Sequence, residues 1–199
     1  GCSGLTSLTL PAGITSIGDD TFYGCSGLTS LTLPAGITSI GEYAFSGCSG
    51  LTSLNLPAGI TSIDKYAFSG CSRLTSLTLP AGITSIGEFA FSYCSGLTSI
   101  YVYAEKVPRI SRYAFEGCAS RKCTLYVPKG TYDNYRLSEF GYFENIVEFD
   151  ATGIDKTTTS TDVEEVSRYS LNGQRLAVPV KGLNIVKYSD GTVRKVVVK

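Results

Sequence analysis

A 17-residue segment, CSGLTSLTLPAGITSIG, occurs unchanged at residues 2–18 and 25–41, and close copies begin at Cys48 and Cys71. A fixed period of roughly 20–50 residues is the signature of a stacked repeat architecture. The repeat therefore restricts the chain to a series of equivalent structural units. Its leading cysteine recurs every 23 residues, and the last step is 24, at Cys2, Cys25, Cys48, Cys71, Cys94 and Cys118.

Each copy predicts the same series of local structures. The Leu-x-Leu alternation is typical of a strand, and Pro11 can end that strand because proline has no N–H to donate. An Ala-Gly turn follows, and residues 14–17 predict a second short strand. The segment GEYAFSG (41–47) predicts one helical turn closed by Gly47. In the first copy the positions predicted to face inward are Cys2, Leu5, Leu8, Leu10, Ile14, Ile17 and Phe22.

One copy cannot fold alone. Burying seven such side chains at roughly 1.5–3 kcal/mol each contributes about 10–20 kcal/mol. Ordering the backbone of a whole copy costs about 1–2 kcal/mol per residue, which is more. Stacked copies bury both faces of each layer and share backbone hydrogen bonds, so stability arises between neighbours. The sequence therefore predicts a solenoid, in which each coil has short strands and one helical turn.

The cysteine column predicts reduced, buried side chains. Equivalent residues of stacked coils lie about 4.8 Å apart, outside the roughly 3.5–4.5 Å that the Cβ atoms of a disulfide prefer. Cys118 and Cys123 are the exception, because they can meet across a short loop, and a disulfide between them stays open. The total of seven is odd, so complete pairing within the chain is impossible.

Composition and charge exclude several functions. The 17 basic and 17 acidic residues balance, so attraction to nucleic acid is not expected. No apolar run approaches the roughly 18 residues of a membrane helix. Without histidine, the usual Ser-His or Cys-His catalysis cannot be assembled, and no spacing matches a zinc site. Asp19 and Asp20 are interpreted as solvated. We therefore expect no enzyme, no cofactor and no metal.

The outward positions suggest one candidate binding site. Along most of the repeats they are Ser and Thr, which favour strands and solubility. Near the C-terminal end of the array tyrosines and basic residues replace them, and tyrosine and arginine are favoured at interfaces. The alternative is that this cluster only seals the end of the array. Ice binding is disfavoured, because T-S-L-T spaces threonines poorly for one strand face. The candidate partner-binding residues are Tyr101, Tyr103, Tyr126, Lys106 and Arg109.

The consensus L-T-S-L-x-L-P-A-G-I-T-S-I-G-x-x-A-F-x-G-C, over residues 1–118, resembles the BspA-type leucine-rich repeats. These repeats are common in surface proteins of Bacteroidetes and some mucosal parasites. The resemblance implies a leucine-rich-repeat solenoid in an exported protein that adheres to host or bacterial partners. Residues 118–150 resemble the terminal cap of such arrays, and their charges would cover an otherwise bare strand edge.

The chain is expected to divide into a solenoid with its cap at 1–150, a polar linker at 151–162 and a small antiparallel β-module at 163–199. Asn172-Gly173 and Asp190-Gly191 predict hairpin turns in the module. Through LNGQR (171–175), KGLNI (181–185) and the basic end at 194–199, the module resembles C-terminal β-modules of exported Bacteroidetes proteins, including a secretion sorting domain. A purely structural β-cap is the alternative.

Two functions follow as expectations. The first is a secreted or cell-surface binding module, without catalysis, that engages a host or bacterial protein or glycoprotein through the solenoid. The second is a passive spacer that presents another domain, which the near identity of the coils favours. The sequence has no initiating Met and no signal peptide, so we expect a trimmed chain.

Overall fold

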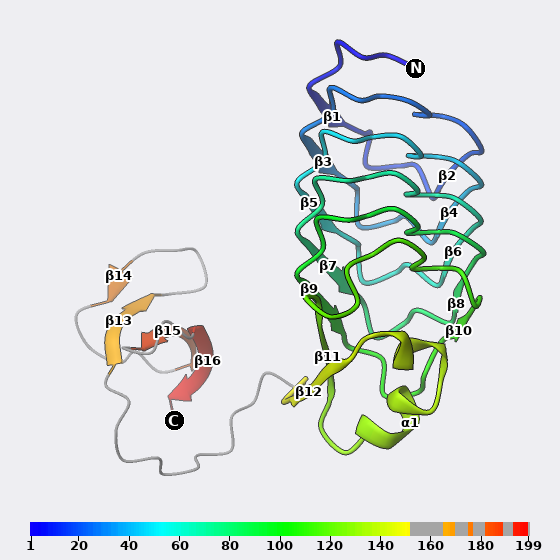
Figure 1. Ribbon diagram of the computed structural model, residues 1–199. Coiled ribbons are helices and arrows are strands. Elements are labelled where there is room, and N and C mark those ends of the chain that lie inside the picture. The colour runs from blue at the N-terminus through cyan, green and yellow to red at the C-terminus, as the bar shows by residue number, and fades with distance from the viewer. Residues whose placement is uncertain (152–164, 170–174, 177–181, 189–192, 199) are drawn as a thin grey trace. The chain divides into compact units, whose positions relative to one another are not determined.

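The computed structural model describes residues 1–151, 165–169, 175–176, 182–188 and 193–198 (Figure 1). The chain divides into two compact units, Gly1–Phe149 and Asp150–Lys199. The first unit is a stack of coils, as the repeat predicts, in which each coil adds one short strand to each of two sides.

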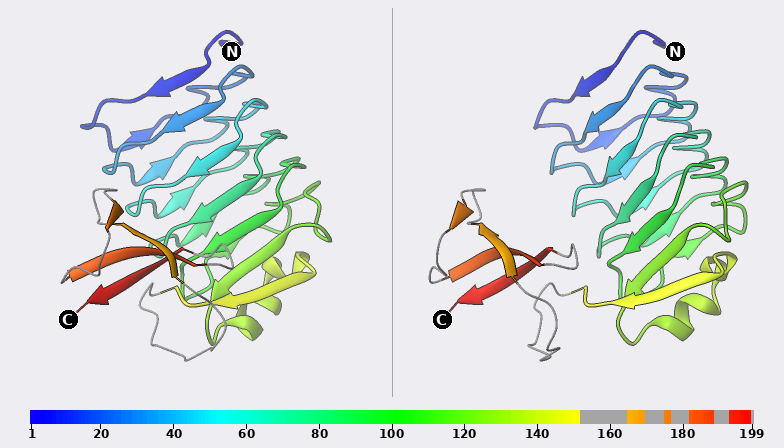
Figure 2. Two further views of the ribbon diagram at one scale, coloured as in Figure 1. Left: turned by 90° about the vertical axis from the view of Figure 1, so that its left-hand side faces the viewer. Right: turned by 60° about the vertical axis from the view of Figure 1, so that its left-hand side comes forward.

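Parallel strands in register line both sides of the stack (Figure 2). Ser16, Ser39, Ser62 and Ser85 pair in succession, one repeat apart. One side carries the pair β1 (Ser7–Thr9) and β3 (Ser30–Thr32), and a sheet ordered β12 (Asn145–Phe149), β11 (Thr124–Pro128), β9 (Ser99–Val102), β7 (Ser76–Leu79), β5 (Ser53–Asn55). The other side carries a sheet ordered β10 (Arg109–Ile110), β8 (Ser85–Ile86), β6 (Ser62–Ile63), β4 (Ser39–Ile40), β2 (Ser16–Ile17).

The predicted inward columns form one continuous core. In the coil that begins at Cys48, the side chains of Leu51, Ile60 and Phe68 are completely buried. The phenylalanines stack along the solenoid, with ring centroids 5.2–5.4 Å apart from Phe22 to Phe115. Each ring thus contacts the equivalent ring of the next coil, which is the neighbour-dependent packing that the repeat requires.

The prediction of a helical turn at residues 41–47 is wrong, because the structure has successive turns there. The N–H groups of Tyr43, Phe45 and Gly47 donate to carbonyls of the next coil, at 2.7–3.0 Å. Those of Ala44 and Ser46 donate three residues back along their own chain. Tyr43 and Gly47 have positive φ, at 54° and 74°, which interrupts a helix. Turns replace the helix because the neighbouring coil supplies acceptors for every second N–H.

The cysteine column is buried from Cys25 to Cys118, as predicted, whereas Cys2 is exposed. All seven cysteines are free thiols, including Cys118 and Cys123. Four of the thiols, those of Cys48, Cys71, Cys94 and Cys118, also donate to the carbonyl of the phenylalanine 26 or 27 residues earlier in the chain, at 3.2–3.5 Å. A thiol is a weak hydrogen-bond donor. The cysteine column therefore links the coils by weak hydrogen bonds as well as by apolar packing.

The cap closes the end of the stack. It contains α1 (Tyr132–Arg136), then the 3-10 helix η1 (Glu139–Tyr142) and strand β12. Tyr135 is completely buried, and its hydroxyl donates to the carbonyl of Ala104 at 2.5 Å. Phe140 and Phe143 pack against Phe115, the last ring of the stack.

The second unit contains a four-stranded antiparallel sheet, ordered β14 (Arg175–Leu176), β13 (Glu165–Tyr169), β15 (Gly182–Tyr188), β16 (Val193–Val198). The predicted hairpin turns at Asn172-Gly173 and Asp190-Gly191 lie outside the described residues, as does the predicted linker apart from residue 151.

Candidate functional site

The outer face of the β5–β12 sheet changes from polar to aromatic toward the cap. Thr78 of β7 pairs with Tyr101 of β9, which pairs with Tyr126 of β11, and Tyr126 pairs with Val147 of β12. The rings of Tyr101 and Tyr126 stack with centroids 4.4 Å apart and planes 6° apart. The strand register therefore brings together two tyrosines that are 25 residues apart in the sequence.

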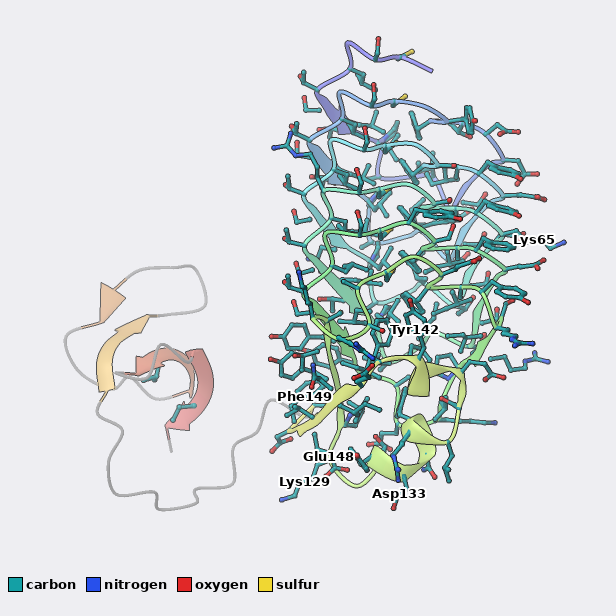
Figure 3. The ribbon with its side chains drawn as sticks, in the orientation of Figure 1. Lys65, Lys129, Asp133, Tyr142, Glu148 and Phe149 are labelled. Carbon is teal, nitrogen blue, oxygen red and sulfur yellow. The ribbon has the colours of Figure 1, made fainter. Side chains whose placement is uncertain are left out.

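Phe149 completes this surface (Figure 3). Its ring meets Tyr103 edge-on at 5.1 Å and Tyr101 edge-on at 6.0 Å. Phe149 pairs with Pro128. Sequence reasoning missed Phe149 because it lies far along the chain, and only the parallel β11–β12 pairing brings it here. We call Tyr101, Tyr103, Tyr126, Val147 and Phe149 the aromatic platform.

The platform is partly exposed, so a partner can contact it. Tyr103 is 38% exposed and Val147 is 46% exposed, whereas Tyr101, Tyr126 and Phe149 are half-buried. Burial, together with the adjacent Tyr126, raises the pKa of Tyr101. Its phenol therefore stays protonated at physiological pH and can donate a hydrogen bond. Stacked aromatic rings with polar ends suit a protein interface.

The two basic candidates do not join the tyrosines. Arg109 lies in β10, on the other sheet, where it pairs with Ser85. Lys106 is exposed between β9 and β10, and within the described residues no ion pair or ring contact involves it. The sequence interpretation grouped these residues because they are close in the chain, but the turn between the two sheets separates Arg109 from the platform.

Arg109 instead borders a shallow groove of about 380 Å³ on the β2–β10 side. Residues 62–64, 85–87 and 109–111 line it, which is one short segment from each of three successive coils. Most of these positions repeat the residues of the other coils. Asp64 and Ser111 stand in the column of Gly18, Gly41 and Gly87, and Arg109 stands in a serine column. The groove thus lies where the repeat departs from its own pattern.

Many hydroxyls of the repeat are already used by the fold. The Thr29, Thr52, Thr75 and Thr98 side chains each donate to the backbone carbonyl of the equivalent threonine one coil earlier, at 3.0–3.5 Å. The Thr38, Thr61 and Thr84 side chains form a second such row, at 2.9–3.3 Å. These two columns reinforce the backbone ladder, so their conservation of residue type from coil to coil has a structural cause.

A second aromatic row, which sequence reasoning also missed, occupies the turns. The rings of Tyr43, Tyr66, Phe89 and Tyr113 stack with centroids 4.7–5.3 Å apart. Its sequence signal is the aromatic residue two positions before the core phenylalanine. Neighbouring rings cover each other's faces, so this row presents mainly ring edges and stabilises the turns.

The described residues offer little for catalysis. No group of three or more metal-ligating side chains occurs among them. Burial raises the pKa of the Cys48 and Cys123 thiols to about 11, which keeps them protonated and unreactive at neutral pH. No helix in the described part of the chain has the length and apolar character needed to cross a membrane.

The family profile of the BspA type leucine rich repeat region matches residues 1–122 in six copies. The chain belongs to the BspA-type leucine-rich repeat family. This BspA-type fold also resembles a leucine-rich repeat protein of T. pallidum, at 27% identity and a TM-score of 0.58, over 73% of this chain and 69% of that one. No curated protein sequence matches this chain.

Two further solved structures share the BspA-type fold. A leucine-rich repeat protein of Bacteroides ovatus is 27% identical with a TM-score of 0.52, over 64% of this chain and 40% of that one. The pneumococcal vaccine antigen PcpA is 18% identical with a TM-score of 0.55, over 72% of this chain and 40% of that one, and supports the fold alone.

Proposed function

We propose that this BspA-type chain is a non-catalytic binding module of a secreted or cell-surface protein, and that the aromatic platform engages a protein or glycoprotein. The family supports the general role, because repeat solenoids present extended binding surfaces. The proposed surface location also rests on the family, because BspA-type repeats are common in surface proteins.

The platform is the observation that carries the proposal. It is the place in the β5–β12 sheet where polar outward residues give way to stacked and partly exposed rings. Aromatic residues form the centres of many interfaces because they bury a large area with few rotatable bonds. The cap explains the burial of Phe140 and Phe143, but Tyr103 and Val147 remain exposed beside it.

The test compares the chain with a double variant, Tyr101→Thr and Tyr126→Thr. Threonine is chosen because the equivalent position of β7 is Thr78, so the variant should fold. A panel of host matrix proteins and bacterial surface fractions would be screened by biolayer interferometry. We expect the double variant to bind the partner at least about tenfold more weakly. Tyr23→Ala is the control, because Tyr23 is 51% exposed but lies outside the platform.

A passive spacer is the second candidate, and the near identity of the coils favours it. Here the platform variant and the wild type would behave alike with every partner. Deletion of the coil at residues 48–70 would shorten the stack and reduce the reach of whatever domain it presents. Equal binding by the wild type and the platform variant would therefore favour the spacer.

A further inference from the structure

We infer that the groove on the β2–β10 side is a binding site for an acidic sugar, such as a sialic acid or a uronic acid unit. The inference does not depend on the aromatic platform, because the groove is lined by residues of the other sheet. It begins from the charged residues that interrupt the repeat there.

Two charged side chains enter the groove from coils two apart. Arg109 comes from β10 and Asp64 follows β6, and β8 lies between these strands. Two strand spacings amount to about 9–10 Å, enough for one or two sugar rings between the charges. Both side chains are exposed, and no ion pair joins Arg109 to an acid within the described residues. A guanidinium in this state can bind a ligand carboxylate with two parallel hydrogen bonds.

The remaining polar groups suit sugar hydroxyls. Ser62 and Ser85 point outward in the same column as Arg109, and their hydroxyls make no hydrogen bond to other described residues. One carboxylate oxygen of Asp64 accepts the N–H of Lys65 at 2.8 Å, and among described groups the other oxygen accepts none. These hydroxyls and this carboxylate can bind the hydroxyl groups of a sugar ring, which act as donors and acceptors at once.

The floor of the groove disfavours a peptide. Of the three isoleucines that line the groove, Ile63 and Ile86 turn inward and are only 2% and 3% exposed, so half-buried Ile110 is the one apolar side chain that the described lining offers to a peptide. Strand β10 lies at the edge of its sheet, but its two residues are too short to add a peptide strand firmly. A shallow, hydroxyl-rich surface with one cation and one anion suits a charged carbohydrate better.

The variants for the test return each position to the residue of the other coils. Arg109→Ser restores the serine of Ser85, and Asp64→Gly restores the glycine of Gly87, so both should fold. Arg112→Ala is the matched control, because Arg112 lies over the Tyr113 ring at 5.6 Å and does not line the groove. The probes are 3′-sialyllactose and oligogalacturonate, which separate the two sources of carboxylate, with neutral lactose as the control sugar.

Saturation-transfer NMR on the full chain measures binding. We expect at least one acidic sugar to bind with about millimolar affinity, as an open site allows, and lactose not to bind. Arg109→Ser should weaken binding about tenfold or more, Asp64→Gly less, and Arg112→Ala not at all. The platform variant should bind the sugar normally, so failure here is separate from failure of the platform.

Three outcomes would overturn the inference. The first is that neither acidic sugar binds the wild type. The second is that the Arg109→Ser variant binds an acidic sugar as tightly as the wild type does. Alternatively, an acidic peptide binds with the same dependence on Arg109 while both sugars fail.

Discussion

Residues 2–18 and 25–41 have the same sequence but different environments. In the second copy Cys25 and Leu28 are 2% and 0% exposed, whereas in the first copy Cys2 is exposed and Leu5 is only half-buried. The local sequence is identical, so it cannot cause the difference. Within residues 1–199 the second copy has a coil on each side, and the first has one on a single side. Burial in this solenoid is therefore set by neighbours, as a one-dimensional repeat requires.

Thiol labelling gives the largest expected contrast between the two copies. In the native chain Cys2 should react at once with a thiol reagent. Cys25 should react only when its coil opens, so its labelling rate should be at least about 100-fold lower than that of Cys2. Mass spectrometry of the labelled chain should show one modified cysteine before denaturation and seven after it. Rapid labelling of several cysteines in the native chain would contradict the account.

A matched pair of leucine substitutions measures the same contrast as stability. Leu28→Ala should lower the free energy of unfolding by about 2–5 kcal/mol, because it leaves a cavity in a completely buried position. Leu5→Ala should cost about 1 kcal/mol or less, since Leu5 is half-buried. Urea denaturation followed by circular dichroism measures both. The surrounding sequences are equal, so each variant is the control for the other, and equal losses would refute neighbour-dependent burial.

The buried thiols predict how stability depends on pH. Burial raises the pKa of Cys48 and of Cys123 from an ordinary 9.0 to about 11. The unfolded chain therefore ionises these thiols at lower pH than the native chain does. Stability should be complete below about pH 9 and should fall as the pH rises from 9 to 11. Denaturation at several pH values measures the decline, and Cys48→Ala should reduce it. Constant stability up to pH 11 would be the contrary result.

The threonine rows give the smallest expected effect. Thr75→Val removes the hydroxyl that donates to the carbonyl of Thr52 at 3.1 Å, and should cost about 0.5–1 kcal/mol. Thr78→Val is the control, since no hydrogen bond of the Thr78 side chain to another described residue is observed. It should be close to neutral by the same urea assay. Equal effects of both variants would remove the proposed role of the threonine rows.

The repeat allowed much of the fold to be predicted. The period fixed which residues stack, so the inward columns and the solenoid could be derived from spacing and burial alone. The turn at 41–47 could not, because its N–H groups find acceptors in the next coil, and a single copy of the sequence does not display them. The helix prediction considered only bonds within one copy.

The candidate site was predicted only in part. Tyr101 and Tyr126 occupy the same column of the repeat, so their stacking follows from its period. Phe149 lies beyond the repeat, and only the pairing of β12 with β11 places it beside Tyr103. Arg109 was wrongly grouped with the tyrosines because closeness in the chain does not show on which sheet a residue lies.

The central claim is that a neighbouring coil, rather than the sequence of the coil itself, buries each side chain. The most direct test adds a copy of residues 24–46 in front of Gly1, which continues the period, with the added cysteine changed to alanine. The labelling rate of Cys2 is then measured in the native state. The account predicts that the rate falls to that of Cys25, and an unchanged rate would contradict it.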